Sequence, residues 1–117
     1  MTKNAKILLV DDEQNWRNLI KEILEKDGYD VRTADSGDSA IELFDAGEYH
    51  LVVTDIRMES EFRGIEVLEY IKKRSPITPV IMLTAYSTVQ TAKESILKGA
   101  VDFFVKGEII DCSEKTF

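Results

Sequence analysis

Cysteine is nearly absent from this chain of 117 residues, and long apolar runs are absent altogether. The single cysteine, Cys112, excludes an internal disulfide framework and fits a reducing compartment. The N-terminal stretch MTKNAK lacks the apolar core of a signal peptide, and no apolar run approaches the roughly 20 residues of a membrane span. These absences favour a cytoplasmic protein.

Positive charge is also in short supply, with 15 lysines and arginines against 22 acidic residues and a net charge of −7. This balance argues against direct binding of nucleic acid or of an anionic membrane. Any DNA-directed role would therefore belong to another domain or partner. The length is that of one domain with one core, residues 1–117.

What is present is an alternation of short apolar runs, rich in β-branched residues, with longer segments of helical period. The runs predict strands at residues 6–10, 29–34, 50–54, 79–83 and 102–105. The segments between them predict helices within residues 13–28, 36–50, 64–76 and 87–100. In the first helix, apolar side chains recur from Trp16 to Leu24, and in the fourth, Val89, Ala92 and Ile96 share a face.

Strands that alternate with helices of this length imply crossover connections and therefore a parallel sheet. The expected fold class is α/β: a doubly wound, five-stranded parallel sheet of order 2-1-3-4-5, flavodoxin-like, with helices on both faces. The near-continuous apolar runs ILLV, LVV and VIML suit strands that are buried on both sides.

Polar residues follow the apolar runs at the points where parallel strands would end on a common edge. Asp11 and Asp12 follow the first run, and Asp55 follows the third. Adjacent carboxylates repel one another unless a cation compensates them, and clustered carboxylate oxygens suit a hard divalent cation such as Mg²⁺. Lys106, with a hydroxyl from Thr84, would complete a site for a small tetrahedral anion, most simply a phosphoryl group.

The segments ILLVDDE, LVVTDIRM, GIEVLEYIK, PVIMLTA and GAVDFFVK, in this order, closely resemble the receiver domain of two-component response regulators over about residues 6–106. The resemblance implies that Asp55 is the phosphoacceptor. It also implies that Asp12 and Asp55 ligate a metal directly, that Asp11 acts largely through water, and that the backbone carbonyl of Arg57 completes the protein ligands.

The same resemblance assigns contacts with the phosphoryl oxygens to Thr84, Ala85 and Lys106, and a conformational switch to Thr84 and Phe103. For Phe103, plain core packing stays open as the alternative. The implied cofactor is Mg²⁺, with Mn²⁺ as a substitute. The implied partners are a sensor histidine kinase or phosphotransfer protein as donor, an output domain or downstream protein, and a phosphorylation-dependent dimer. Such a module takes up and loses its own phosphoryl group and is not a turnover enzyme on an external substrate.

The chain departs from the family pattern in three places. Glu59 stands where proline is usual, and the acidic loop is one residue longer before Gly64, which would bring Glu59 and Glu61 close to the metal. Gly107 replaces the proline that usually follows the lysine. Residues 108–117 have only a faint helical period, which indicates either a short fifth helix or a piece cut from a longer regulator.

Other functions stay open on the residues alone. The longer loop and Gly107 would suit a receiver-like interaction module that no longer switches. A phosphatase that works through an aspartyl-phosphate would need a second acid where Arg57 stands, and a flavin-binding domain would need a Ser/Thr/Gly-rich loop in place of DDEQN. Asp12 taken alone suits a helix N-cap.

Overall fold

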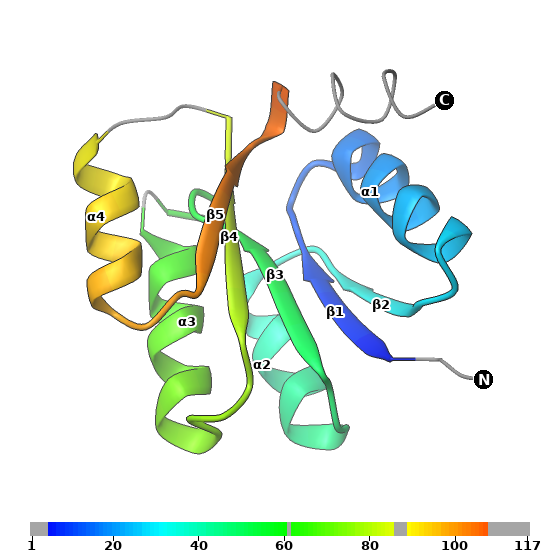
Figure 1. The fold of residues 1–117 in the computed structure, drawn as a ribbon, viewed down its shortest axis with the longest axis horizontal. Helices are drawn as coiled ribbons and strands as arrows, with labels where there is room; N and C mark the ends of the chain where they lie inside the picture. Colours follow the sequence, from blue (N-terminus) through cyan, green and yellow to red (C-terminus); the bar gives the residue numbers. More distant parts are fainter. Residues whose placement is uncertain (1–4, 61, 86–88, 108–117) are drawn as a thin grey trace.

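The computed structural model describes residues 5–60, 62–85 and 89–107, with side chains at 89–92 left aside. Within these residues the chain forms five strands: β1 (Lys6–Val10), β2 (Asp30–Ala34), β3 (Leu51–Asp55), β4 (Val80–Thr84) and β5 (Asp102–Val105). Every strand pairing is parallel, and the order is β2-β1-β3-β4-β5. The predicted sheet is confirmed (Figure 1).

Helices connect the strands and cover both faces of the sheet (Figure 1). They are α1 (Gln14–Lys26), α2 (Gly37–Ala46), α3 (Arg63–Arg74) and α4 (Val89–Leu97). Helix α1 packs through Ile20 on one face, whereas α2 and α3 pack on the other. Residues 108–117, including Cys112 and the segment expected to form a fifth helix, lie outside the described residues, as does Glu61.

The central strand β1 is buried on both sides, as its unbroken apolar run predicts. Ile7 and Leu9 contact the cluster beneath α1, while Leu8 and Val10 contact the cluster beneath α2 and α3. Successive side chains of a strand point to opposite faces, so one strand contributes to two cores. Helix α3 completes the larger core with its buried apolar stripe, which includes Ile65, Val67, Leu68 and Ile71.

Strands β1 and β5 have their predicted bounds, whereas the other three strands differ from the prediction by one residue, which affects the site. Strands β2, β3 and β4 each begin one residue later than expected, and β3 and β4 extend through Asp55 and Thr84. Asp55 therefore pairs with Leu83, and Thr84 pairs with Val105. The sheet ladder, rather than a loop, fixes the backbone of both residues.

One local prediction on the helices is wrong, and one alternative does not hold. The alternative that Asp12 serves only as a helix N-cap does not hold, because the N-cap of α1 is Glu13, whose side chain makes no capping hydrogen bond. On α4, Ile96 is about half exposed, at 48%, whereas its neighbour Ser95 is fully buried. The apolar period of a short helix shows that one face is buried, but neighbouring elements decide which face it is.

Candidate functional site

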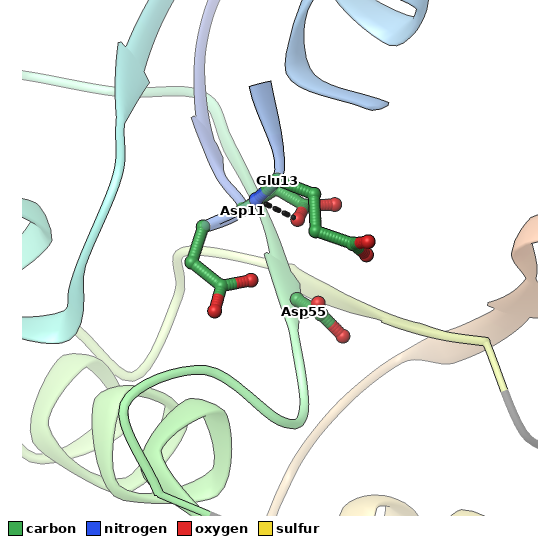
Figure 2. Close-up of side chains that lie close together, drawn as sticks. Asp11, Glu13 and Asp55 are labelled. Atoms are coloured by element: carbon green, nitrogen blue, oxygen red, sulfur yellow. Dashed lines mark hydrogen bonds between the residues drawn. The ribbon is translucent and has the colours of Figure 1, made fainter. Parts of the chain in front are cut away.

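The carboxyl ends of β1 and β3 bring acidic side chains together at one edge of the sheet (Figure 2). The Asp11 N–H donates to the carbonyl of Ala34 at 3.1 Å, which continues the sheet ladder past the end of β1. Asp11 is fully buried and Asp55 is 5% exposed. One carboxylate oxygen from each of Asp11, Asp12, Glu13 and Asp55 lies within 4.8 Å of the others. The predicted convergence of Asp11, Asp12 and Asp55 is confirmed. Glu13 is a fourth member of the cluster, to which the sequence had assigned no role.

Lys106 follows β5 directly and points its ammonium into this acidic cluster. The Nζ atom lies 2.8 Å from Asp11 Oδ2, 3.1 Å from Asp55 Oδ2 and 3.1 Å from Glu13 Oε1. The contact with Asp11 is an ion pair, whereas those with Asp55 and Glu13 are also hydrogen bonds. The Lys106 side chain is 1% exposed. A buried ammonium thus compensates charge on the buried acids.

The aromatic ring of Trp16 completes the surroundings of this ammonium. The Nζ atom of Lys106 lies 5.4 Å from the centroid of the ring, which is within the range of a cation–π interaction. Trp16 also packs against the smaller core cluster, so the expectation that it belongs to the core is confirmed. As the one tryptophan of the chain, it is a natural fluorescent probe of the site.

Burial and mutual repulsion shift the pKa values in the cluster. Burial, followed by the charge of Asp11, raises the pKa of Asp55 to about 6, although Lys106 opposes the shift. Burial and the charge of Asp11 also raise the pKa of Asp12. For Lys106, burial alone would lower the pKa, but Asp11 and Asp55 outweigh it and the pKa is raised. The ammonium therefore stays charged. The ionised form of Asp55, in contrast, is less stable near neutral pH than it would be in water.

This shift predicts a specific pH dependence of stability in the absence of divalent metal. Between about pH 4 and pH 6 the folded protein binds more protons at Asp55 than the unfolded chain, so Asp55 makes folding less favourable as the pH rises. Relative to Asp55→Asn, the free energy of unfolding of the wild type should fall by about 2 to 3 kcal/mol through this window. Urea unfolding in EDTA at a series of pH values measures it. A difference between the two proteins that does not change with pH would contradict the shift.

The other predicted site residues lie around the same edge. Thr84 is buried at the end of β4, whereas Ala85 and Arg57 are exposed just beyond β4 and β3. Phe103, on β5, is half-buried and packs against the larger core cluster. The described residues contain no cis peptide bond, so the bond between Lys106 and Gly107 is trans.

Gly64, at the start of α3, allows the helix to approach the backbone of Asp55. Its N–H donates to the carbonyl of Ile56 at 2.9 Å. A Cβ atom at this position would lie 1.8 Å from the Asp55 carbonyl oxygen and 2.7 Å from the Ile56 Cα, closer than any side chain tolerates. The glycine is therefore required for the position of Asp55.

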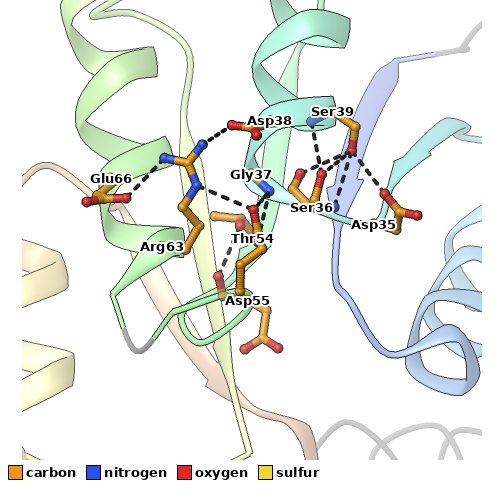
Figure 3. A network of polar contacts seen from close by, with 10 residues as sticks. Asp35, Ser36, Gly37, Asp38, Ser39, Thr54, Asp55, Arg63 and Glu66 are labelled. Carbon is orange, nitrogen blue, oxygen red and sulfur yellow. Dashed lines mark hydrogen bonds and ion pairs between the residues drawn. The ribbon is translucent and has the colours of Figure 1, made fainter.

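Glu59 does not lie at the acidic cluster, and this expectation is wrong. Both oxygens of its carboxylate accept from the Gly37 N–H at the start of α2, at 3.1 and 2.9 Å. Arg63 lies 3.5 Å from Glu59 and also pairs with Asp38 and Glu66 (Figure 3). A carboxylate at a helix N-terminus is favourable, and here it ties the loop after β3 to α2.

The donor set of the cluster fits a hard divalent cation. Carboxylate oxygens are the ligands that Mg²⁺ and Mn²⁺ prefer, and Mg²⁺ takes one or two of them with waters and phosphate oxygens. Asp12 and Glu13 are exposed and so leave the cluster open to solvent on one side, whereas Asp11 and Asp55 are buried. The arrangement can therefore hold a metal ion and still admit an anion beside it.

Comparison with known proteins places this chain in one family. The family model for the response regulator receiver domain matches residues 7–111. The transcriptional regulatory protein ZraR of Escherichia coli is 40% identical over 103 residues, which cover 88% of this chain and 23% of ZraR. The regulatory protein AtoC of Escherichia coli is 38% identical over 106 residues, 91% of this chain and 23% of AtoC.

Solved structures agree. The receiver domain of NtrX from Brucella abortus superposes with a TM-score of 0.79 at 36% identity, covering 93% of this chain and 95% of that one. The response regulator TrrA from Thermotoga maritima, solved in complex with Mg²⁺–BeF, gives a TM-score of 0.79 at 37% identity, covering 97% and 99%. The chain belongs to the family of response regulator receiver domains.

The family sets the biological context as two-component signal transduction. The chain spans 23% of the length of ZraR and of AtoC, so the rest of those regulators has no counterpart in it. In the part of the chain that the structure describes, no helix is both long enough and apolar enough to cross a bilayer.

Proposed function

We propose that Asp55 accepts a phosphoryl group in a reaction that requires Mg²⁺, and that the aspartyl-phosphate is the signalling state of this receiver. One observation carries the proposal: the Asp55 carboxylate lies between a buried ammonium, 3.1 Å away, and a cluster of acids that a metal would neutralise. An uncharged or solvent-exposed strand end would not require a buried ammonium on one side and a metal on the other to compensate its charge.

The residues have distinct tasks in the transfer. A carboxylate oxygen of Asp55 attacks the phosphorus atom, and the bond between phosphorus and the leaving group breaks. With a phosphohistidine donor the imidazole nitrogen keeps the bonding electrons and is protonated; with acetyl phosphate the leaving group is acetate. Lys106 would stay beside Asp55 and donate to a phosphoryl oxygen, while Thr84 and Ala85 would contact the other oxygens.

Asp11, Asp12, Asp55 and the backbone carbonyl of Arg57 would hold the metal. When bound, Mg²⁺ would neutralise charge on the transferring oxygens, which is the main requirement of phosphoryl transfer. The similar TrrA structure contains Mg²⁺ together with BeF, which supports the assignment by analogy. Mn²⁺ would serve as a substitute because it accepts the same oxygen ligands.

The switch would begin at Thr84 and reach the surface through Phe103. Thr84 would move to donate a hydrogen bond to the new phosphoryl group, and Phe103, now half-buried, would turn into the space that Thr84 leaves. The surface of α4 and β5 would then change, which is a shift between two packings of the same chain. The partners would be a sensor histidine kinase or phosphotransfer protein, and an output domain or downstream protein in the cytoplasm.

Incubation with acetyl phosphate and Mg²⁺ tests the proposal. Intact mass spectrometry should show the mass of one added phosphoryl group on the wild type and none on Asp55→Asn. EDTA should prevent the addition, because without a bound metal the acidic cluster would repel the incoming dianion. Phosphorylation that persists in Asp55→Asn, or that proceeds equally in EDTA, would contradict the assignment. Failure of the wild type to take up phosphoryl would favour the module that does not switch.

A further inference from the structure

We propose that Glu13 slows phosphoryl uptake at Asp55, because its carboxylate occupies Lys106 and repels the incoming anion. The inference rests on the proposed function of Asp55. It concerns the one member of the acidic cluster for which neither the sequence reasoning nor the proposed function supplies a role.

The backbone of Glu13 is held in place, while its side chain is committed to Lys106. Its N–H donates to Asp11 Oδ1 at 2.9 Å (Figure 2). Glu13 is the N-cap of α1, yet its side chain makes no capping hydrogen bond. Its Oε1 atom instead accepts from Lys106 at 3.1 Å, across 93 residues of sequence.

The ammonium of Lys106 is already engaged by carboxylates before an anion arrives. A lysine ammonium has three N–H donors, and Lys106 faces three carboxylates, those of Asp11, Glu13 and Asp55. A phosphoryl oxygen must therefore compete with these carboxylates for the ammonium.

Glu13 is the partner that gives way, because it alone is exposed. Its side chain is 58% exposed, against 0% for Asp11 and 7% for Asp55. Water can solvate a released Glu13 carboxylate, whereas a released Asp11 or Asp55 would be a buried charge without a partner. Breaking the exposed pair is still unfavourable, and the freed carboxylate lies beside a phosphoryl group that is itself a dianion.

The chemical step is unchanged by this exchange of partners. Asp55 attacks the phosphorus atom of acetyl phosphate, the bond from phosphorus to the acetyl oxygen breaks, and acetate leaves with the electron pair. Lys106 moves one hydrogen bond from Glu13 Oε1 to a phosphoryl oxygen. The cost of that move is part of the barrier, and a neutral residue 13 would reduce it.

The test compares Glu13→Gln and Glu13→Ser with the wild type and with Glu22→Gln. Serine removes the carboxylate and supplies a favourable N-cap for α1, so the test does not depend on the folding of one variant. Glu22→Gln removes the same charge from an exposed position on α1 and controls for net charge. The rate of the acetyl phosphate adduct is followed by intact mass at saturating Mg²⁺, and the Mg²⁺ affinity by Trp16 fluorescence.

We expect uptake about two- to fivefold faster in both Glu13 variants than in the wild type, with an unchanged rate in Glu22→Gln. The Mg²⁺ affinity should fall only about two- to fivefold in the Glu13 variants, through the loss of a nearby charge, and the difference in rate should shrink at high salt. A rate at or below that of the wild type in both Glu13 variants would overturn the inference. A loss of Mg²⁺ affinity of roughly a hundredfold or more in them would also overturn it and make Glu13 a metal ligand. An absence of any adduct on the wild type would instead refute the proposed function, and this inference with it.

Discussion

Replacing Gly64 with alanine is expected to destabilise the domain by about 3 kcal/mol or more and to abolish phosphoryl uptake. The added methyl group would lie 1.8 Å from the carbonyl oxygen of Asp55. The obstructing atoms are backbone and cannot rotate away. Ile56 is buried and its N–H donates to the carbonyl of Leu83 at 2.9 Å, so the strand end is fixed on its other side.

Two further glycines provide matched controls for this prediction. At Gly107 an added Cβ meets nothing within 4 Å, so alanine there should change the stability little. At Gly28 the space is also open but φ is +94°, and alanine should cost about 1 kcal/mol through backbone strain alone. Urea unfolding orders the three variants. A Gly64→Ala protein as stable as Gly28→Ala would show that the close approach of α3 to Asp55 is wrong.

Replacing Lys106 with methionine should destabilise the metal-free protein by about 3 to 5 kcal/mol near neutral pH. The substitution preserves most of the side-chain volume but leaves Asp11 and Asp55 buried without a compensating charge. Mg²⁺ should recover much of the lost stability, because it neutralises the same oxygens. Phosphoryl uptake should fall at least tenfold even at saturating Mg²⁺, since the donor to the phosphoryl oxygens is gone.

The control is Lys98→Met. It removes an exposed ion pair in which Lys98 Nζ lies 2.9 Å from Glu69 Oε2. That variant should lose little stability, because solvent screens an exposed ion pair. The double variant Lys106→Met/Asp55→Asn should be more stable than Lys106→Met alone, because one of the uncompensated charges is removed. Urea unfolding in EDTA measures the stability of these variants. Equal losses of stability in Lys106→Met and Lys98→Met would contradict the buried contacts of Lys106 with the acidic cluster.

The fold and the centre of the site could be predicted because both follow from local patterns. The apolar run before Asp11 is long enough for a buried strand, and the alternation with helices implies a parallel sheet. Parallel strands end on one edge, so Asp11, Asp55 and Lys106 had to converge if the strand order was right. The order depends on the crossovers, and the common doubly wound arrangement of five parallel strands supplied it.

Contacts between distant loops could not be read in the same way. Glu59 was expected near the metal because it follows Asp55 closely, but its partner is the Gly37 N–H, 22 residues earlier. Gly64 looks like any glycine before a helix until the position of the Asp55 carbonyl is known. Glu13 stands at the start of a predicted helix, and only the fold shows that Lys106 lies within its reach.

The identity of the modified atom tests the account most directly. After incubation with acetyl phosphate and Mg²⁺, borohydride reduction converts an aspartyl-phosphate to homoserine, and peptide sequencing locates the change. The account predicts homoserine at position 55 alone, and none when EDTA replaces Mg²⁺. Homoserine at position 11 or 12, or a chain left unmodified with Mg²⁺ and donor in excess, would contradict it.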